Sequence, residues 1–263
     1  MNSEKVANHI VGWLRSYAEK SNVKGFVVGV SGGIDSAVTS TLCAKTGLQT
    51  ICVEMPIHQD PSQVSRALEH IDNLKENYSN VRSVRADLTN SFEVFQEAFE
   101  SSDASAVKDL TLANTRARIR MTALYYIAGM NGCLVAGTGN KVEDFGVGFY
   151  TKYGDGGVDI SPIADLVKSE VFALGAELAV PHAIQNAAPT DGLFGDSRTD
   201  EDQLGASYDE LELAMKQADS GLSVDELQGR EKEVFTIYSR LNANNQHKMN
   251  PIPVCEVPEA MKE

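Results

Sequence analysis

Apolar residues recur with two different periods along most of the chain, and each period predicts a different kind of element. Val6, Ile10, Trp13 and Tyr17 follow one another at intervals of three or four residues, which is typical of an amphipathic helix. Short apolar runs bounded by glycine or polar residues, such as residues 26–28, instead predict buried strands. Strands are expected over residues 25–31, 49–55, 81–86 and 134–136, and helices over residues 4–21, 37–45, 89–99, 106–130 and 164–178 and after Asp60-Pro61.

Strands and helices therefore alternate along the chain. This order predicts an α/β fold with a doubly wound, mostly parallel sheet flanked by helices. Ligands of such sheets bind outside the carboxyl ends of the strands. Glycine-containing turns follow two of the predicted strands, after residues 30 and 136, so both turns are expected at that edge.

The C-terminal part has a different pattern, which predicts a loop followed by helices. Residues 186–212 contain eight acidic residues and one arginine. Residues 186–206 are expected to form a mobile lid over a ligand, although a solvated surface loop would have the same composition. One helix is expected to begin at Tyr208 and another after the capping box that Ser223 and Glu226 form. We expect residues 1–263 to form a single domain with a helical C-terminal part.

Charge and composition exclude several classes of protein. The chain has 23 Lys and Arg against 37 Asp and Glu, a formal net charge of −14, whereas a broad nucleic-acid surface would be basic. No apolar run reaches the ~18 residues of a membrane helix, and the first ten residues lack the apolar region of a signal peptide. The four cysteines have no C-x-x-C spacing. We therefore expect a cytoplasmic protein with no nucleic-acid or membrane partner.

Residues 29–36 form a glycine-rich turn, Gly-Val-Ser-Gly-Gly-Ile-Asp-Ser, between the first predicted strand and a helix. Glycine lets the backbone close around a phosphate, and the N–H groups of a helix N-terminus attract an anion. Ser31 and Ser36 add hydroxyl donors, and Asp35 could hold Mg²⁺ against phosphate oxygens. The turn is neither a Walker A loop nor a G-x-G-x-x-G fingerprint. The alternative is an ordinary turn in which Asp35 only caps the helix.

A second polar segment follows the strand predicted at residues 134–136. Its Thr138 could hydrogen-bond a nucleotide, and Glu143 could give Mg²⁺ a second carboxylate beside Asp35. A glutamate near a helix start is equally typical of a capping residue. Only the neighbouring position of the two turns in a parallel sheet favours a shared site.

The glycine-rich turn resembles the PP-loop, Ser-Gly-Gly-x-Asp-Ser, of the N-type ATP pyrophosphatases, whose fold is adenine nucleotide alpha-hydrolase-like. Within that group, residues 151–159, Thr-Lys-Tyr-Gly-Asp-Gly-Gly-Val-Asp, resemble the signature of the NAD synthetases. Shorter matches follow in the family's order, at residues 114–118, 188–190, 199–205 and 245–248. One difference is that the segment after Glu143, residues 144–147, is one residue longer than the common family pattern.

The resemblance implies a role for each matching residue. ATP would be bound by Gly29, Val30, Ser31, Gly32, Gly33, Ile34, Asp35, Ser36, Thr138, Lys168 and Thr190, and Mg²⁺ by Asp35 and Glu143. Deamido-NAD would be bound by Arg118, Lys152, Asp159, His247 and Lys248. Without the resemblance, Arg118 and Lys168 would be typical of solvated surface charges, and His247 of a structural or exposed residue.

The resemblance also implies a reaction and a partner. ATP would activate the nicotinate carboxylate of deamido-NAD as an adenylate, and ammonia would then convert it to NAD. The expected catalytic residues are Asp155, Ser31 and Lys168. Asp155 is the expected base toward ammonium, although aspartate beside glycine is also typical of a plain turn. Family members of this length are homodimers without a glutamine-hydrolysing domain. Alternatives are another PP-loop ligase, acting on a different carboxylate or on tRNA, and a nucleotide-binding regulatory module.

Overall fold

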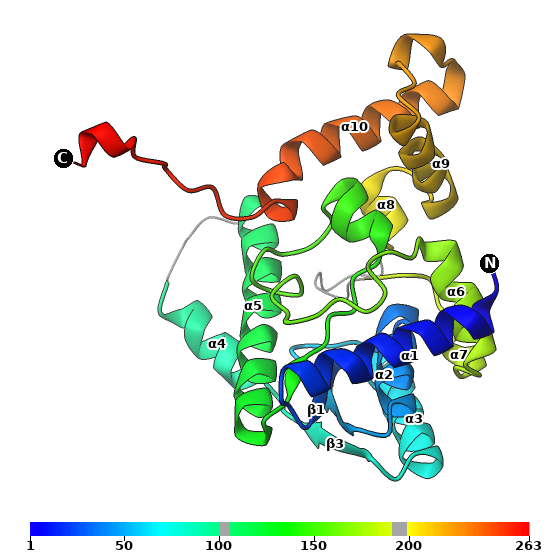
Figure 1. Cartoon of the computed structure of the whole chain (residues 1–263), viewed down its shortest axis with the longest axis vertical. Helices are drawn as coiled ribbons and strands as arrows, with labels where there is room; N and C mark the ends of the chain where they lie inside the picture. Colours follow the sequence, from blue (N-terminus) through cyan, green and yellow to red (C-terminus); the bar gives the residue numbers. More distant parts are fainter. Residues whose placement is uncertain (100–105, 191–198, 263) are drawn as a thin grey trace.

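The computed structural model describes residues 1–99, 106–190 and 199–262 and is built on a small parallel sheet (Figure 1). Its strands are β1 (Gly25–Gly29), β2 (Gln49–Glu54), β3 (Val81–Arg85) and β4 (Leu134–Val135), in the order β3-β2-β1-β4. All pairs are parallel, and Val27 of β1 lies opposite Ile51 on one side and Val135 on the other. The predicted doubly wound α/β fold is confirmed, with every strand ending at the same edge.

Helices cover both faces of this sheet, because successive side chains of a strand point to opposite sides. On one face, Phe26 and Val28 pack with α1 (Ser3–Lys20), α2 (Ile34–Lys45) and α6 (Lys168–Glu177). On the same face, Cys52 of β2 packs with α3 (Pro61–Asn77). On the other, Val27 and Val135 pack with α5 (Ala106–Asn131), which α4 (Thr89–Glu97) contacts. The burial of both faces explains why β1 is a continuous apolar run.

The C-terminal part of the chain forms a second apolar cluster, which contains no residue of the four strands. The short helices α7 (His182–Gln185) and α8 (Asp200–Leu204) lead to α9 (Tyr208–Asp219) and α10 (Gly229–Met249). α9 and α10 pack against η1 (Val142–Val147), a π-helix, through the buried Val142, Val147, Leu211 and Phe235. Two 3₁₀ turns, η2 (Val224–Glu226) and η3 (Glu259–Met261), complete the described elements. Beyond α10 the chain extends away from the body (Figure 1).

Most predicted elements are present, with three differences at helix starts. α2 begins at Ile34 rather than Ala37, so Asp35 and Ser36 lie in its first turn. α6 begins at Lys168 rather than Ala164, where the carboxylate of Glu170 accepts the backbone N–H of Val167. The Ser223 capping box is formed, but it starts only η2, because the chain becomes extended at Leu227 before α10.

No helix within the described ranges is long and apolar enough to cross a membrane. Of the predicted lid, residues 191–198 lie outside the described residues, while residues 200–204 form α8.

Candidate active site

The glycine-rich turn connects β1 to α2 and is braced by its own serines. The backbone N–H groups of Ser31 and Gly33 donate to the Oγ atoms of Ser36 (3.2 Å) and Ser31 (3.3 Å), respectively. Gly32 has φ +83°, and a Cβ there would lie 2.6 Å from the carbonyl oxygen of Gln63. No side chain of the described residues caps α2 at Gly33, which leaves its first N–H groups available to a ligand.

A cavity of about 280 Å³ opens above this turn, at the carboxyl ends of β1, β2 and β4. All eleven residues predicted to bind ATP line it, namely Gly29, Val30, Ser31, Gly32, Gly33, Ile34, Asp35, Ser36, Thr138, Lys168 and Thr190. Glu143, Asp144 and Asp155 line the same cavity. The structure therefore brings together segments that are separated by more than 100 residues in the chain.

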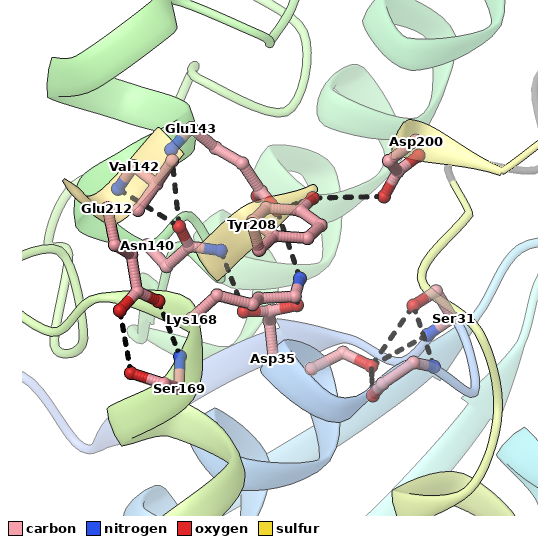
Figure 2. Close-up of polar contacts among 12 residues, drawn as sticks. Ser31, Asp35, Asn140, Val142, Glu143, Lys168, Ser169, Asp200, Tyr208 and Glu212 are labelled. Carbon is pink, nitrogen blue, oxygen red and sulfur yellow. Dashed lines mark hydrogen bonds and ion pairs between the residues drawn. The ribbon is translucent and has the colours of Figure 1, made fainter. Parts of the chain in front are cut away.

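Lys168 lies at the centre of the charged groups in this cavity (Figure 2). Its Nζ is 2.6 Å from Oδ2 of Asp35 and 3.0 Å from Oε1 of Glu143, and its side chain is only 3% exposed. Burial opposes the charge of Lys168, but the attraction of the two carboxylates outweighs burial and raises the pKa of the ammonium above its usual value. Lys168 is therefore a permanent cation between the two predicted metal ligands.

Each of these carboxylates also accepts a hydrogen bond from a neutral side chain (Figure 2). Nδ2 of Asn140 donates to Oδ1 of Asp35 at 3.0 Å, and its Oδ1 accepts the backbone N–H of Val142 and Glu143. The hydroxyl of Tyr208 donates to Oε1 of Glu143 at 2.5 Å. The two carboxylates are thus held in place from both sides.

Two further carboxyl groups in the cavity have raised pKa values. Burial and the nearby charges of Glu143, Asp155 and Asp35 raise the pKa of Asp144 to about 8. Desolvation also raises the pKa of Asp155 to about 6, although its carboxylate faces the cavity and accepts the N–H of Thr151 at 2.9 Å. Near neutral pH, Asp155 is therefore largely an anion that can accept a proton.

Replacing Asp144 with asparagine should make the protein more stable at pH 8. The folded protein holds a proton on Asp144 up to about pH 8, whereas the unfolded chain releases it near pH 4, so this group lowers stability as pH rises between these values. Asparagine has nearly the shape of the protonated acid and removes that loss. The difference in melting temperature between Asp144→Asn and the parent should therefore grow from about zero at pH 4 to a few degrees at pH 8. A constant difference would contradict this explanation.

The residues predicted to bind deamido-NAD lie outside this cavity, and four of them form a neighbouring group. The carbonyl oxygen of Lys152 accepts from Nε of Arg118 (3.3 Å), and Nζ of Lys152 donates to the carbonyl of His247. Nζ of Lys248 donates to the carbonyls of Gly148 (2.7 Å) and Tyr150 (2.8 Å). Asp159 lies apart, accepting from the N–H of Val135 (2.8 Å) and the hydroxyl of Tyr125 (3.0 Å).

Comparison with known proteins identifies the family. The family model described as NAD synthase matches residues 6–252 of the chain. The chain belongs to the NAD synthase family. The NH(3)-dependent NAD(+) synthetase of Methanosarcina acetivorans is 33% identical over 262 residues, which cover 98% of this chain and 100% of that protein. The corresponding protein of Syntrophomonas wolfei is 34% identical over 264 residues, with full coverage of both chains.

Solved structures of the family have the same fold. NMN synthetase from Francisella tularensis superposes with a TM-score of 0.82 at 31% identity and covers 98% of this chain and 99% of that one. The NH3-dependent NAD synthetase from Campylobacter jejuni superposes with a TM-score of 0.77 at 24% identity and covers 97% and 100%, respectively. Residues 144–147, the segment expected to be longer than the family pattern, lie in the π-helix η1.

Several residues of this NAD synthase site were not predicted from the sequence. Arg120 lines the cavity and donates to the carbonyl of Met55 (3.0 Å) and to Oε1 of Gln59 (2.7 Å). Tyr208 and Asn140 contact the predicted metal ligands. The alternating arginines at positions 116, 118 and 120 were a signal for Arg120, but no local pattern pointed to Tyr208.

The carboxylates of this site suit a magnesium ion that is bound together with phosphates. Asp35 and Glu143 offer hard oxygen donors, and both already approach one cation, the ammonium of Lys168. Within the described parts of the chain, no group of three or more His, Cys, Asp or Glu could hold a metal. Mg²⁺ usually takes one or two carboxylates together with substrate phosphates, so the residues present fit it.

Proposed function

We propose that this protein is a ligase that makes NAD from deamido-NAD, ATP and ammonia, releasing AMP and pyrophosphate. The observation that carries this proposal is the single cavity in which a phosphate-type turn, the Asp35–Lys168–Glu143 network and the carboxylate of Asp155 meet. Membership of the NAD synthase family and the NH(3)-dependent relatives support it.

The first half-reaction is adenylation. The carboxylate of the substrate attacks the α-phosphorus of ATP, a P–O bond forms, and the bond to the β-phosphate breaks to release pyrophosphate. The N–H groups at the start of α2, the hydroxyl of Ser31 and the ammonium of Lys168 stabilise the charge on the phosphates. Mg²⁺ held by Asp35 and Glu143 would supply further positive charge against the phosphate oxygens. Thr138 and Thr190 line the same cavity and contact the nucleotide.

The second half-reaction is amidation. Ammonia attacks the carbonyl carbon of the adenylate, a C–N bond forms, AMP leaves with the electron pair of the C–O bond, and the nitrogen gives up one proton to AMP or to water. Ammonium must first lose a proton, because only the neutral amine has a free electron pair. Asp155 accepts this proton, since its pKa of about 6 leaves it ionised but still basic near neutral pH.

The remainder of the deamido-NAD molecule binds beside the cavity. Arg118, Lys152, His247 and Lys248 form a basic group there, suited to the phosphates of a dinucleotide. Asp159, at the end of the same signature loop, would contact deamido-NAD near Tyr125.

We also propose a cytoplasmic homodimer that covers exposed apolar residues of α5, among them Tyr126 and Met130, which are 70% and 71% exposed.

A second candidate substrate is deamido-NMN, the corresponding mononucleotide. The specific observation in its favour is the superposition with the Francisella NMN synthetase, which has a TM-score of 0.82 at 31% identity. Both candidates carry the same nicotinate carboxylate, so the two half-reactions above apply to either. They differ in whether an adenosine half must bind beside the signature loop.

One assay distinguishes these candidates. The protein is incubated with ATP, Mg²⁺ and ammonium, and with either deamido-NAD or deamido-NMN at equal concentration, and NAD and NMN are quantified by chromatography. We expect kcat/KM to be higher for deamido-NAD. A higher value for deamido-NMN would favour the second candidate. Pyrophosphate release with neither substrate, but with another carboxylic acid, would favour a different PP-loop ligase.

Replacing Gly32 with alanine should weaken ATP binding by tenfold or more. The left-handed φ of +83° and the carbonyl of Gln63 at 2.6 Å leave no room for a Cβ, so the turn that cradles the phosphates must shift. Isothermal titration with ATP and Mg²⁺ measures the change. Gly12→Ala in α1 is the matched control, because a Cβ there meets nothing within 4 Å. Equal ATP affinity in Gly32→Ala and the parent would contradict a role for this turn.

A further inference from the structure

The N-terminal half of α9 contacts two of the three elements that carry the charged network, η1 with Glu143 and α6 with Lys168. Tyr208 and Glu212, four residues apart, lie on the same face of α9. The hydroxyl of Tyr208 reaches Glu143 on η1, and the carboxylate of Glu212 accepts the N–H (2.8 Å) and hydroxyl (2.7 Å) of Ser169, which follows Lys168 on α6 (Figure 2). The helix α9 is therefore hydrogen-bonded both to Glu143 and to the residue that follows Lys168.

The contacts of Tyr208 are too specific for a packing role alone. The residue is only 4% exposed, yet its hydroxyl points into the network, 2.5 Å from Oε1 of Glu143 and 3.2 Å from Oδ2 of Asp200. A phenol has a single proton to donate, and the shorter distance directs it to Glu143. The ammonium of Lys168 lies 4.7 Å from the centre of the same ring.

If Asp35 and Glu143 bind a metal ion, Lys168 must leave its position between them. Its Nζ lies within 3.0 Å of both Asp35 and Glu143, in the space that a metal ion bound by them would need. Two cations in that space would repel each other, whereas the phosphates of ATP offer Lys168 a new partner in the same cavity. The neutral donors Asn140 and Tyr208 can stay in place, because they carry no charge that opposes a metal.

We propose that Tyr208 is a positioning residue that keeps Glu143 aimed at the metal when Lys168 moves to the phosphates of ATP. Asn140 does the same for Asp35 through its 3.0 Å hydrogen bond. This inference rests on the proposed function, because it assumes that Asp35 and Glu143 bind the metal of an ATP-consuming reaction. The inference adds Tyr208 to that site. It also distinguishes two partners of Glu143: Lys168, which leaves when ATP binds, and Tyr208, which stays.

The test measures metal binding rather than turnover. Mn²⁺ is titrated into the full chain with saturating α,β-methylene ATP, which cannot be cleaved between the α- and β-phosphates, and free Mn²⁺ is followed by electron paramagnetic resonance. Tyr208→Phe should raise the Mn²⁺ dissociation constant about tenfold, the effect expected for losing one hydrogen bond to a charged group. Raising the metal concentration should restore NAD formation, because the defect is one of affinity.

Tyr238→Phe is the matched control. Tyr238 is 6% exposed in the same apolar cluster, and no hydrogen bond of its hydroxyl is found among the described residues, so its removal should leave the Mn²⁺ affinity unchanged. Melting temperatures without metal show whether either variant has lost its fold. An unchanged Mn²⁺ affinity in Tyr208→Phe, or equal weakening in both variants, overturns the inference. If the wild-type protein makes NAD but does not bind Mn²⁺ with the analogue, the inference fails while the proposed reaction stands.

Discussion

Replacing Lys168 with methionine should reduce both pyrophosphate release and NAD formation by about a hundred- to a thousandfold, the range found when one charge-stabilising donor is removed from an active site. Methionine keeps an apolar stem that is one atom shorter but removes the ammonium that lies 2.6 Å from Asp35 and 3.0 Å from Glu143. Because Lys168 would act on the phosphates, the first half-reaction should fail. Pyrophosphate release with deamido-NAD, ATP and Mg²⁺ measures this step directly.

The same substitution should lower the melting temperature of the metal-free protein. It leaves two carboxylates without their cation, and breaking a buried ion pair costs ~3–5 kcal/mol. The side chains of Asp35 and Glu143 are 17% and 16% exposed, so water in the cavity should reduce that cost. Lys75→Met is the control, because it removes only an exposed pair with Asp72. Pyrophosphate release at the parent rate in Lys168→Met would exclude Lys168 from adenylation.

Replacing Asp155 with asparagine should leave adenylation intact and slow amidation by about a hundredfold or more, as expected for loss of a general base. Asparagine can still accept the N–H of Thr151, so the turn is retained, but it cannot take a proton from ammonium. Pyrophosphate release in a single turnover should match the parent, while NAD formation at limiting ammonium should fall.

The pH profile gives a second measurement. In the parent, amidation should decrease as pH falls through about 6, because protonation of Asp155 removes the base. Asp155→Asn should lack this inflection. Asp165→Asn, which changes a carboxylate that is 96% exposed, should keep both the rate and the inflection. Parent-like amidation at limiting ammonium in Asp155→Asn would remove the assignment.

The sheet and the cavity were predictable because their signals are local. Each strand of the sheet is a short apolar run or alternation, and glycine at position 32 is required by the φ of +83° that the turn adopts. Strands that alternate with helices form a parallel sheet, and in such a sheet the turns after β1 and β4 lie at the same edge, where the strands end. The resemblance then supplied Lys168, which comes from a third segment and which periodicity alone would have left as an ordinary helical lysine.

The positioning contacts were not predictable for the opposite reason. The hydroxyl of Tyr208 donates to Glu143, which is 65 residues away in the sequence. Only the packing of α9 against η1 brings the two residues together. The start of α2 was misplaced because Gly33, not a Ser or Asp, precedes its first turn. The Ser223 capping box predicted a long helix, but the extended backbone at Leu227 and Gln228 confines it to three residues.

The π-helix at Val142–Val147 gives this chain a wider helical turn directly beside its proposed reactive centre. One residue inserted into an α-helix rotates everything beyond it by about 100°, which would carry the downstream signature loop out of register. A π turn instead takes the additional residue into a wider ring. Gly148, with φ +66°, ends this π-helix in the left-handed conformation. In this chain the wider turn therefore lets Asp144 and the following signature loop, with Asp155, line the same cavity.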